Sequence, residues 1–258
     1  MEVIVNSIST GVLCVLFTGL CICVTCLGLC FFRKLQVREG LKMNHDVTAV
    51  IYGVITLIYS LILAFVIVAV WQDYEEINTD ITKEADKLRG IINHAEELPD
   101  SIGVPIRESV IDYVKLVAGN GWHSMQSGKS ERESINAITN IMRITFNAQV
   151  ESQRELNILR LIHDDVGDVS DLRVDRLTHT HSHVPTLVWL VLITGSIISV
   201  IYSYFFFVDS ARHQYIITSF LATMIAMSLF LVYMLDHPFY GSSSISQQPF
   251  IDVLEGIP

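Results

Sequence analysis

The side chains most able to do chemistry form a stripe of hydroxyl groups on the second apolar stretch of the chain. Thr48, Tyr52, Thr56 and Tyr59 follow one another at spacings of three or four residues, so they share one face of a helix. Leu61–Val70, which comes next, is wholly apolar. Hydroxyls in a wet vestibule followed by a hydrophobic constriction are typical of a pore that gates by dewetting. Hydrogen bonding and close packing between the helices of one bundle is the other interpretation.

Helical geometry indicates which apolar side chains would continue this stripe. Counting about 100° per residue from Thr56, Leu63, Ile67 and Val70 lie within about 40° of the stripe, whereas Phe65 lies about 180° away. We therefore predict the constriction at Leu63, Ile67 and Val70, with Phe65 packing behind it. The predicted pore lining is Thr48, Tyr52, Thr56, Tyr59, Leu63, Ile67 and Val70.

A run of alternating histidines, His179, His181 and His183, could bind a divalent metal together with Asp175. In a helix, however, residues two apart point in nearly opposite directions and cannot converge on one ion. Only an extended segment ahead of Pro185 would bring two of them to one side. We therefore predict solvated histidines at a membrane boundary and no metal site.

Other signs of catalysis are missing from the sequence. It has no nucleophile elbow, phosphate-binding loop, dinucleotide fingerprint or pair of Cys-x-x-Cys motifs. Acidic pairs such as Glu75-Glu76 and Asp164-Asp165 fall on helix faces expected to be solvated. We expect no catalytic residue, no cofactor and no enzymatic activity.

All five cysteines lie in the first apolar stretch, where small packing residues are expected. Palmitoylation at Cys30, beside Arg33, is the alternative. The five are Cys14, Cys21, Cys23, Cys26 and Cys30.

The composition explains where these residues are placed. Of the 258 residues, 51% are hydrophobic and only 17% are charged, against about a quarter charged in a soluble domain. Four stretches are free of charge and long enough to cross a bilayer, which takes about 20 residues. The first is too long for a signal peptide and has no basic segment before it. The predicted spans are Ile8–Phe32, Val47–Trp71, Val184–Val208 and Tyr215–Leu235.

The segment between the second and third spans has the opposite character. From Gln72 to His183 it holds 12 Lys and Arg against 20 Asp and Glu, which supplies −8 of the formal net charge of −10. An acidic surface argues against nucleic-acid binding. We predict an all-α protein with four transmembrane helices and an α-helical soluble domain inserted between the second and third. The expected division is 1–71 (first two spans), 72–183 (soluble domain), 184–236 (last two spans) and 237–258 (tail).

The short loops carry the positive charge that marks the cytoplasmic side of a membrane. Arg33–Asp46 contains four basic residues and the second short loop contains Arg212, whereas Met1–Ser7 and His237–Pro258 contain no Lys or Arg. We therefore predict a multi-pass protein of the cell (inner) membrane, with the soluble domain and both termini extracytoplasmic.

Apolar periodicity predicts the helices of the soluble domain. The second span continues as one helix from Asp46 to Gly90, and a further helix begins at Pro105. A capping box of Ser130 and Glu133 opens a long helix that is interrupted near Gly167. The buried side of that helix is predicted to hold Ile135, Ile138, Met142, Phe146, Leu156 and Leu159.

Several segments together resemble the bestrophin-like bacterial membrane proteins. The second span and its exit, from His45-Asp46 to Glu84-Ala85, resemble the family signature. Tyr113 with Trp122, Met125 and Gly128 is similar to its mid-domain pattern, and Pro185 with Trp189 to the start of its third span. The closing motif is matched by Asp236 to Gly241, with His237 where Arg is usual and Tyr240 where Ser is usual.

The resemblance implies a four-span protomer of a ring-shaped homo-oligomer, with five copies as one candidate size, in which the second helix lines an ion pore. It also marks Pro238, Phe239 and Gly241 as closing-motif residues. We interpret the chain as an ion channel of unknown permeant ion, with the lipid bilayer and further copies of itself as partners. The alternative is a non-conducting sensor or scaffold that binds a partner through its soluble helices.

Overall fold

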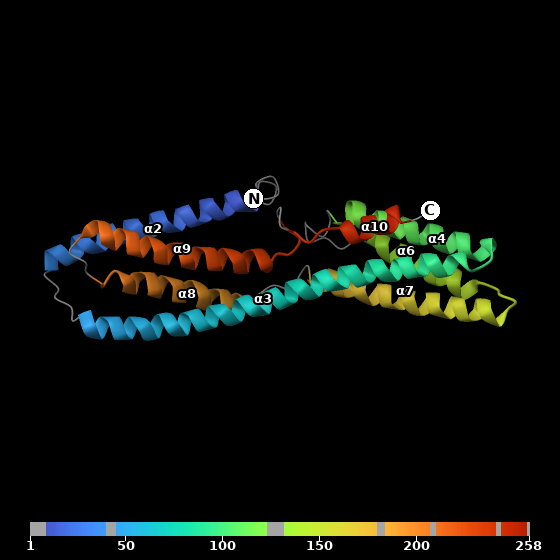
Figure 1. Ribbon diagram of the computed structural model, residues 1–258, viewed down its shortest axis with the longest axis horizontal. Coiled ribbons are helices and arrows are strands. Elements are labelled where there is room, and N and C mark those ends of the chain that lie inside the picture. Colours follow the sequence, from blue (N-terminus) through green and yellow to red (C-terminus); the bar gives the residue numbers. More distant parts are fainter. Residues whose placement is uncertain are drawn as a thin grey trace. The chain divides into compact units, whose positions relative to one another are not determined.

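The computed structural model of the protein describes residues 9–39, 45–122, 132–179, 184–206, 210–240 and 244–256. Within these ranges every regular element is a helix, which confirms the all-α class. In chain order the helices are α2 (Thr10–Glu39), α3 (His45–Glu96), α4 (Asp100–Leu116), the π-helical turn η1 (Val117–Gly121), α6 (Arg132–Asn147), α7 (Gln153–His179), α8 (Thr186–Ser203), α9 (Ala211–Leu235) and α10 (Gln248–Glu255) (Figure 1).

The chain divides into two compact units. The first consists of Met1–Asp73 with Val184–Ser243, and the second of Tyr74–His183 with Ser244–Pro258. The long helix α3 contributes its first part to the first unit and the remainder to the second. The sequence analysis assigned 237–258 to a separate tail, whereas α10 within that segment packs against α4 in the second unit.

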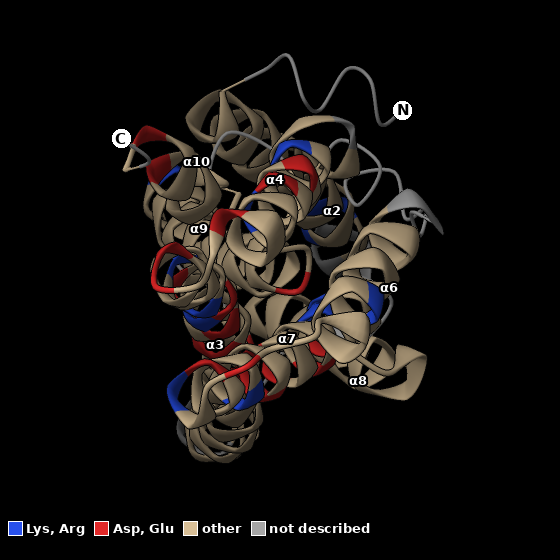
Figure 2. Cartoon of the chain, turned by 90° about the vertical axis from the view of Figure 1, so that its right-hand side faces the viewer, with Lys and Arg blue, Asp and Glu red and all other residues tan. Residues whose placement is uncertain are grey.

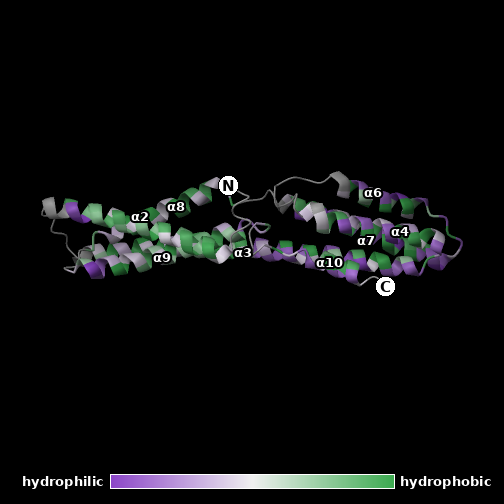
Figure 3. Cartoon of the chain, turned by 90° about the horizontal axis from the view of Figure 1, so that it is seen from above, coloured by the Kyte–Doolittle hydropathy of each residue, from purple (hydrophilic) through white to green (hydrophobic). Residues whose placement is uncertain are grey.

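The two units differ in charge and in hydropathy. Figure 2 marks acidic and basic residues interspersed along α4 and α7 of the second unit. In Figure 3, hydrophobic residues predominate along α2, α8 and α9. In the described part of the chain, four helices are long and apolar enough to cross a membrane, as predicted, and they include the segments Thr10–Leu35, Thr48–Glu96, Thr186–Ser203 and Ala211–Leu235.

In the first unit, α2 lies beside α9, and α8 lies beside α9 as well (Figure 1). Phe17 of α2 meets Phe230 of α9 with ring centroids 6.1 Å apart. The Cys26 sulfur lies 3.5 Å from the Ser219 hydroxyl. The second contact puts Cys26 at the packing surface, which is the environment expected of a small apolar side chain in a bundle.

In the second unit, α3 is buried along one stripe, which includes Ile77, Ile81, Ala85 and Leu88 as the periodicity predicted. The helix runs six residues past the predicted end at Gly90. Gly is tolerated there because the cost of about 1 kcal/mol in a helix interior is outweighed by the buried neighbours on both sides.

The helix after α3 begins earlier than predicted, at Asp100, and Pro105 lies inside it. Pro99 precedes its first residue. Gly103 makes this early start possible, since a Cβ at that position would lie only 2.2 Å from the Ala95 carbonyl oxygen. The absence of a side chain therefore lets α4 turn back closely against the end of α3.

The predicted long helix through Ile135 and Leu159 is in fact two helices, α6 and α7. The chain leaves the helical path after Asn147, and Ser152 then caps α7. The Glu155 amide donates to the Ser152 hydroxyl at 3.1 Å, and the Ser152 amide donates back to the Glu155 carboxylate at 3.3 Å. This reciprocal pair is a capping box that the sequence analysis missed.

The predicted buried side of that segment is correct only in part. Ile138 and Leu159 are buried, but Ile135 and Phe146 are exposed. Both exposed residues lie within α6, whose buried stripe is instead formed by Ser134, Ile138, Ile141 and Thr145. Ser130, the predicted cap, lies outside the described residues. Gly167 does not interrupt α7, because Val166 and Val169 are buried on either side of it.

Candidate functional site: the two faces of α3 and the buried ion pair

The predicted pore-lining residues lie on one face of α3, and that face is the one turned toward the rest of the protomer. Most of them are buried, and the others are partly buried. The buried members are Thr48, Tyr59, Leu63 and Val70; the partly buried ones are Tyr52, Thr56 and Ile67.

Helix α8 and the residues just after it cover this face. Tyr52 stacks on Tyr202 with ring centroids 5.8 Å apart and an interplanar angle of 12°. Tyr59 lies so close to Gly195 that a Cβ there would be 2.4 Å from the Tyr59 ring. The missing side chain at Gly195 thus lets the ring sit against the α8 backbone, a close approach typical of helices packed in a membrane.

An apolar cluster continues the contact along the helix. Tyr59 and Leu63 of α3 pack with Leu192 of α8 and Val232 of α9, and Ile67 packs at the edge of the cluster. The Thr56 hydroxyl donates to the Tyr52 carbonyl of its own helix at 2.8 Å. Within the protomer, the stripe is therefore a packing surface between helices.

The opposite face of α3 is apolar and open. Leu61, Phe65 and Val68 are 56%, 67% and 53% exposed. They lie within about 60° of one another and roughly opposite Leu63 by the helical repeat. The sequence analysis expected Phe65 to be packed and Ile67 to be open; in the protomer, Phe65 is exposed and Ile67 is in contact with the cluster.

The second unit holds a buried ion pair that the sequence analysis did not recognise. Glu84 of α3 is 0% exposed and Arg176 of α7 is 3% exposed. The Arg176 Nε donates to Glu84 Oε2 at 2.8 Å, and Nη2 donates to Oε1 at 3.1 Å. Two parallel N–H···O bonds of this kind form the most directional of protein ion pairs.

Tyr113 of α4 completes this group. Its hydroxyl donates to Glu84 Oε1 at 2.5 Å. Burial and then the Glu84 carboxylate raise the pKa of Tyr113 well above its ordinary value, which keeps it protonated as the donor. Burial has the largest single effect on the pKa of Arg176 and lowers it, but Glu84 and Tyr113 together outweigh burial, so the net effect raises the pKa of Arg176.

Aromatic side chains seal the ion pair from solvent. The Arg176 guanidinium lies 5.6 Å from the centre of the Phe250 ring of α10, within the range of a cation–π contact. Phe250 in turn meets Trp122 edge-on at 6.0 Å. The Glu84 carboxylate therefore joins α3, α4 and α7 in a dry core, with α10 covering it.

A sequence signal for this group existed. Glu84 is three residues after Ile81 and four before Leu88, so it occupies the buried stripe of α3. Arg176 likewise continues the buried positions Val166, Val169 and Arg173 of α7. Two opposite charges on two apolar stripes indicate a buried pair.

The family model of the bestrophin-like domain matches residues 19–250 of this chain. The chain belongs to the bestrophin-like family. The resemblance inferred from the motifs is thereby confirmed, and the match includes α3, the ion pair and Phe250.

Solved structures of a bacterial bestrophin homolog have a fold similar to that of this chain. A point mutant of a bacterial bestrophin homolog from Klebsiella pneumoniae superposes with a TM-score of 0.73 at 9% identity, over 94% of this chain and 97% of the homolog. A second point mutant of that homolog gives 0.72 at 8% identity, over 92% and 98%. Among curated proteins, none matches the chain.

The closing motif of this bestrophin-like chain forms a turn after α9. The Asp236 carboxylate accepts a hydrogen bond from the Val184 amide at 2.7 Å, which ties the end of α9 to the entrance of α8. His237 stacks on Tyr233 with centroids 4.4 Å apart. Pro238 and Phe239 are buried, and Gly241 lies outside the described residues, as do Met125, Gly128, His181 and His183.

Replacing Phe239 with alanine is expected to destabilise the bestrophin-like chain by about 3 kcal/mol, the scale of a buried Phe truncation. The reason is its near-complete burial in the turn of the closing motif. Thermal unfolding of the purified protein and its oligomer size would measure the effect. An unchanged melting temperature would mean that Phe239 is surrounded by lipid or solvent. Phe220→Ala, at an exposed position of α9, is the control.

Proposed function

We propose that this bestrophin-like chain is the protomer of a homo-oligomeric ion channel of the inner membrane, with the pore lined by α3. The observation that supports it most is the second, open apolar face of α3, because a helix that packs on α8 with one face has the other available to a central axis. The Val47–Trp71 stretch holds no charged residue, which favours passive conduction over ion-coupled pumping.

Burial within the protomer favours a different constriction from the one predicted at Leu63, Ile67 and Val70. Leu63 and Val70 are buried in the protomer, and turning Leu63 toward an axis would break its cluster with Leu192 of α8. We therefore assign the narrowest part of the pore to Leu61, Phe65 and Val68. A ring of these side chains would resist ions because ions must shed water to pass it.

Two measurements on the purified full-length protein test this function. Native mass spectrometry gives the number of copies, and a monomer would leave no axis for α3 to line. Planar-bilayer recording gives the current. An oligomer that passes no current under any applied voltage or salt would support the sensor or scaffold function in its place.

We further propose that Arg33–Asp46, which runs from the last part of α2 into the start of α3, is cytoplasmic, as its four basic residues suggest. Gln149 is exposed between α6 and α7. In a variant with all five native cysteines replaced by alanine, Gln149→Cys is expected to react with a membrane-impermeant thiol reagent in intact cells.

Lys34→Cys in the same background is the matched control. Lys34 is exposed near the C-terminal end of α2, within the segment proposed to be cytoplasmic. It should react only after the membrane is permeabilised. The reverse pattern, with Lys34→Cys labelled first, would place the second unit in the cytoplasm and overturn the proposed orientation.

A further inference from the structure

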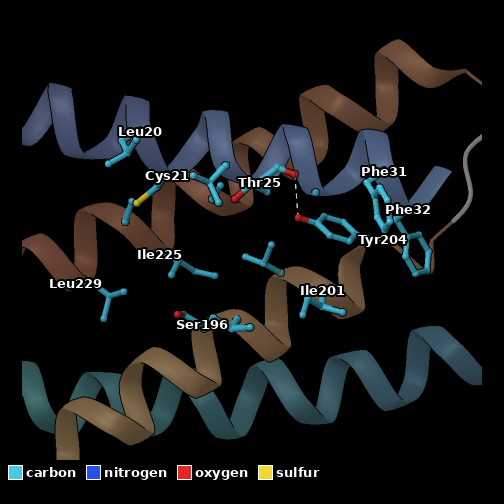
Figure 4. A pocket seen from close by; sticks show the side chains of 16 residues that line it. Leu20, Cys21, Thr25, Phe31, Phe32, Ser196, Ile201, Tyr204, Ile225 and Leu229 are labelled. Atoms are coloured by element: carbon cyan, nitrogen blue, oxygen red, sulfur yellow. Dashed lines mark hydrogen bonds between the residues drawn. The ribbon is translucent and has the colours of Figure 1, made fainter. Parts of the chain in front are cut away.

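The first unit contains a cavity among α2, α8 and α9, away from the face of α3 that carries the proposed pore. Its volume is about 580 Å³, within the range of sites that hold a small molecule. Figure 4 shows side chains from these three helices lining one common space, with Leu20 and Cys21 of α2 near one end and Phe31 and Phe32 near the other.

Two hydroxyl groups of the lining already have partners in the protein. The Tyr204 hydroxyl donates to the Thr25 carbonyl at 2.9 Å (Figure 4), and the Ser196 hydroxyl donates to the Ile193 carbonyl at 2.7 Å. Gly28 allows the first of these bonds, since a Cβ there would lie 2.8 Å from the Tyr204 oxygen. The remaining lining is mostly apolar, so the cavity favours an occupant that needs no hydrogen bond.

The length of the cavity suits a lipid chain. Leu20 and Phe32 both line it and are twelve residues apart on α2, a rise of about 18 Å. One leaflet of the hydrocarbon core is about 15 Å thick, half of the bilayer core. An acyl chain lying along α2 would thus fill the cavity within a single leaflet.

Positive charge collects at one end. Arg33 and Lys34 directly follow Phe32 on α2, and Arg212 begins α9 at the same end of the helix pair. The Arg33 guanidinium donates to the Gln214 side chain of α9, which brings the two helix ends together. Basic groups at the surface of a membrane attract anionic lipid headgroups.

We propose that this cavity binds one acyl chain of an anionic glycerophospholipid, with its phosphate near Arg33, Lys34 and Arg212. Binding does not depend on conduction. It would stabilise the packing of α2 on α9 and make the protein sensitive to the lipid composition of its membrane.

The test compares two tryptophan substitutions one turn apart on α2. Val24 lines the cavity and is 61% exposed, whereas Leu27 is 71% exposed and does not line it. Both positions are open, so both variants are expected to fold. The purified full-length proteins would be titrated with dioleoylphosphatidylglycerol or dioleoylphosphatidylcholine, and bound lipid counted by native mass spectrometry.

The unaltered protein and Leu27→Trp are expected to retain phosphatidylglycerol. Val24→Trp is expected to bind this lipid about tenfold more weakly, because displacing even two methylene groups of the acyl chain costs that much affinity. Lys34→Ala with Arg212→Ala should remove the preference for phosphatidylglycerol over phosphatidylcholine. Equal retention by Val24→Trp and Leu27→Trp would overturn the proposal. A change in copy number without a change in bound lipid would assign the cavity to a second copy of the chain and also overturn it.

Discussion

Replacing Arg176 with methionine is expected to destabilise the protein by about 3–5 kcal/mol, because it leaves the Glu84 carboxylate buried without its counter-charge. Glu84 accepts both hydrogen bonds of the guanidinium and one from Tyr113 in a core closed by Phe250. A loss of this size lowers the melting temperature of a chain this long by roughly 10 °C or more. Circular dichroism of the purified full-length protein would measure it.

Two comparisons separate a buried pair from a general loss of charge. The double variant Glu84→Gln with Arg176→Met should recover a large part of the lost stability, since neither charge is then left alone. Arg154→Met removes the partner of Glu97 in an ion pair that is mostly exposed, so its cost should stay below about 1 kcal/mol. Equal effects of Arg176→Met and Arg154→Met would contradict the assignment of Glu84 to a dry core.

The second large effect is expected at the proposed constriction. Phe65→Ser should raise the single-channel current several-fold, because a hydroxyl in place of an aromatic ring both widens and wets the narrowest part of an apolar pore. Ile67→Ser should instead weaken the protomer, since Ile67 packs against the cluster of Tyr59, Leu63 and Leu192. Planar-bilayer recording and thermal unfolding on the same preparations would distinguish the two.

Val15→Ser provides the matched control for the pore, because Val15 is an exposed apolar residue of α2 and lines no proposed pathway. Its current should equal that of the unaltered protein. If Ile67→Ser raises the current and Phe65→Ser does not, the constriction lies on the Leu63–Ile67–Val70 face, as the sequence first suggested, and α8 must move away from α3 in the assembled channel.

Composition and periodicity were enough to determine much of this protein. An apolar helix long enough for a bilayer is a local property, and all four such helices were recognisable from their lack of charge. The continuity of α3 followed from helical spacing without a breaker. The closing motif, the second-span signature and their order along the chain were enough to identify the bestrophin-like family.

Two features of α7 were predicted wrongly, although the residues that decide them lie close together in the sequence. Ser152 and Glu155 form a capping box that is visible in the sequence, but the apolar periodicity on either side of it favours a single helix. Gly167 does not break α7, because a single Gly costs only about 1 kcal/mol in a helix interior. The burial of Val166 and Val169 stabilises α7 by more than that cost.

The remaining features depended on tertiary structure. In the apolar half of α3, both faces carry the same kind of side chain, because a surface facing lipid is as apolar as one facing another helix. Polarity therefore could not decide that Leu63 packs on α8 while Phe65 stays open; the small size of Gly195 and the position of Leu192 decided it. The ion pair also depends on tertiary structure, because Glu84 and Arg176 are 92 residues apart in the sequence. Only the packing of α7 against α3 brings their charges together, where burial makes the pair costly to break.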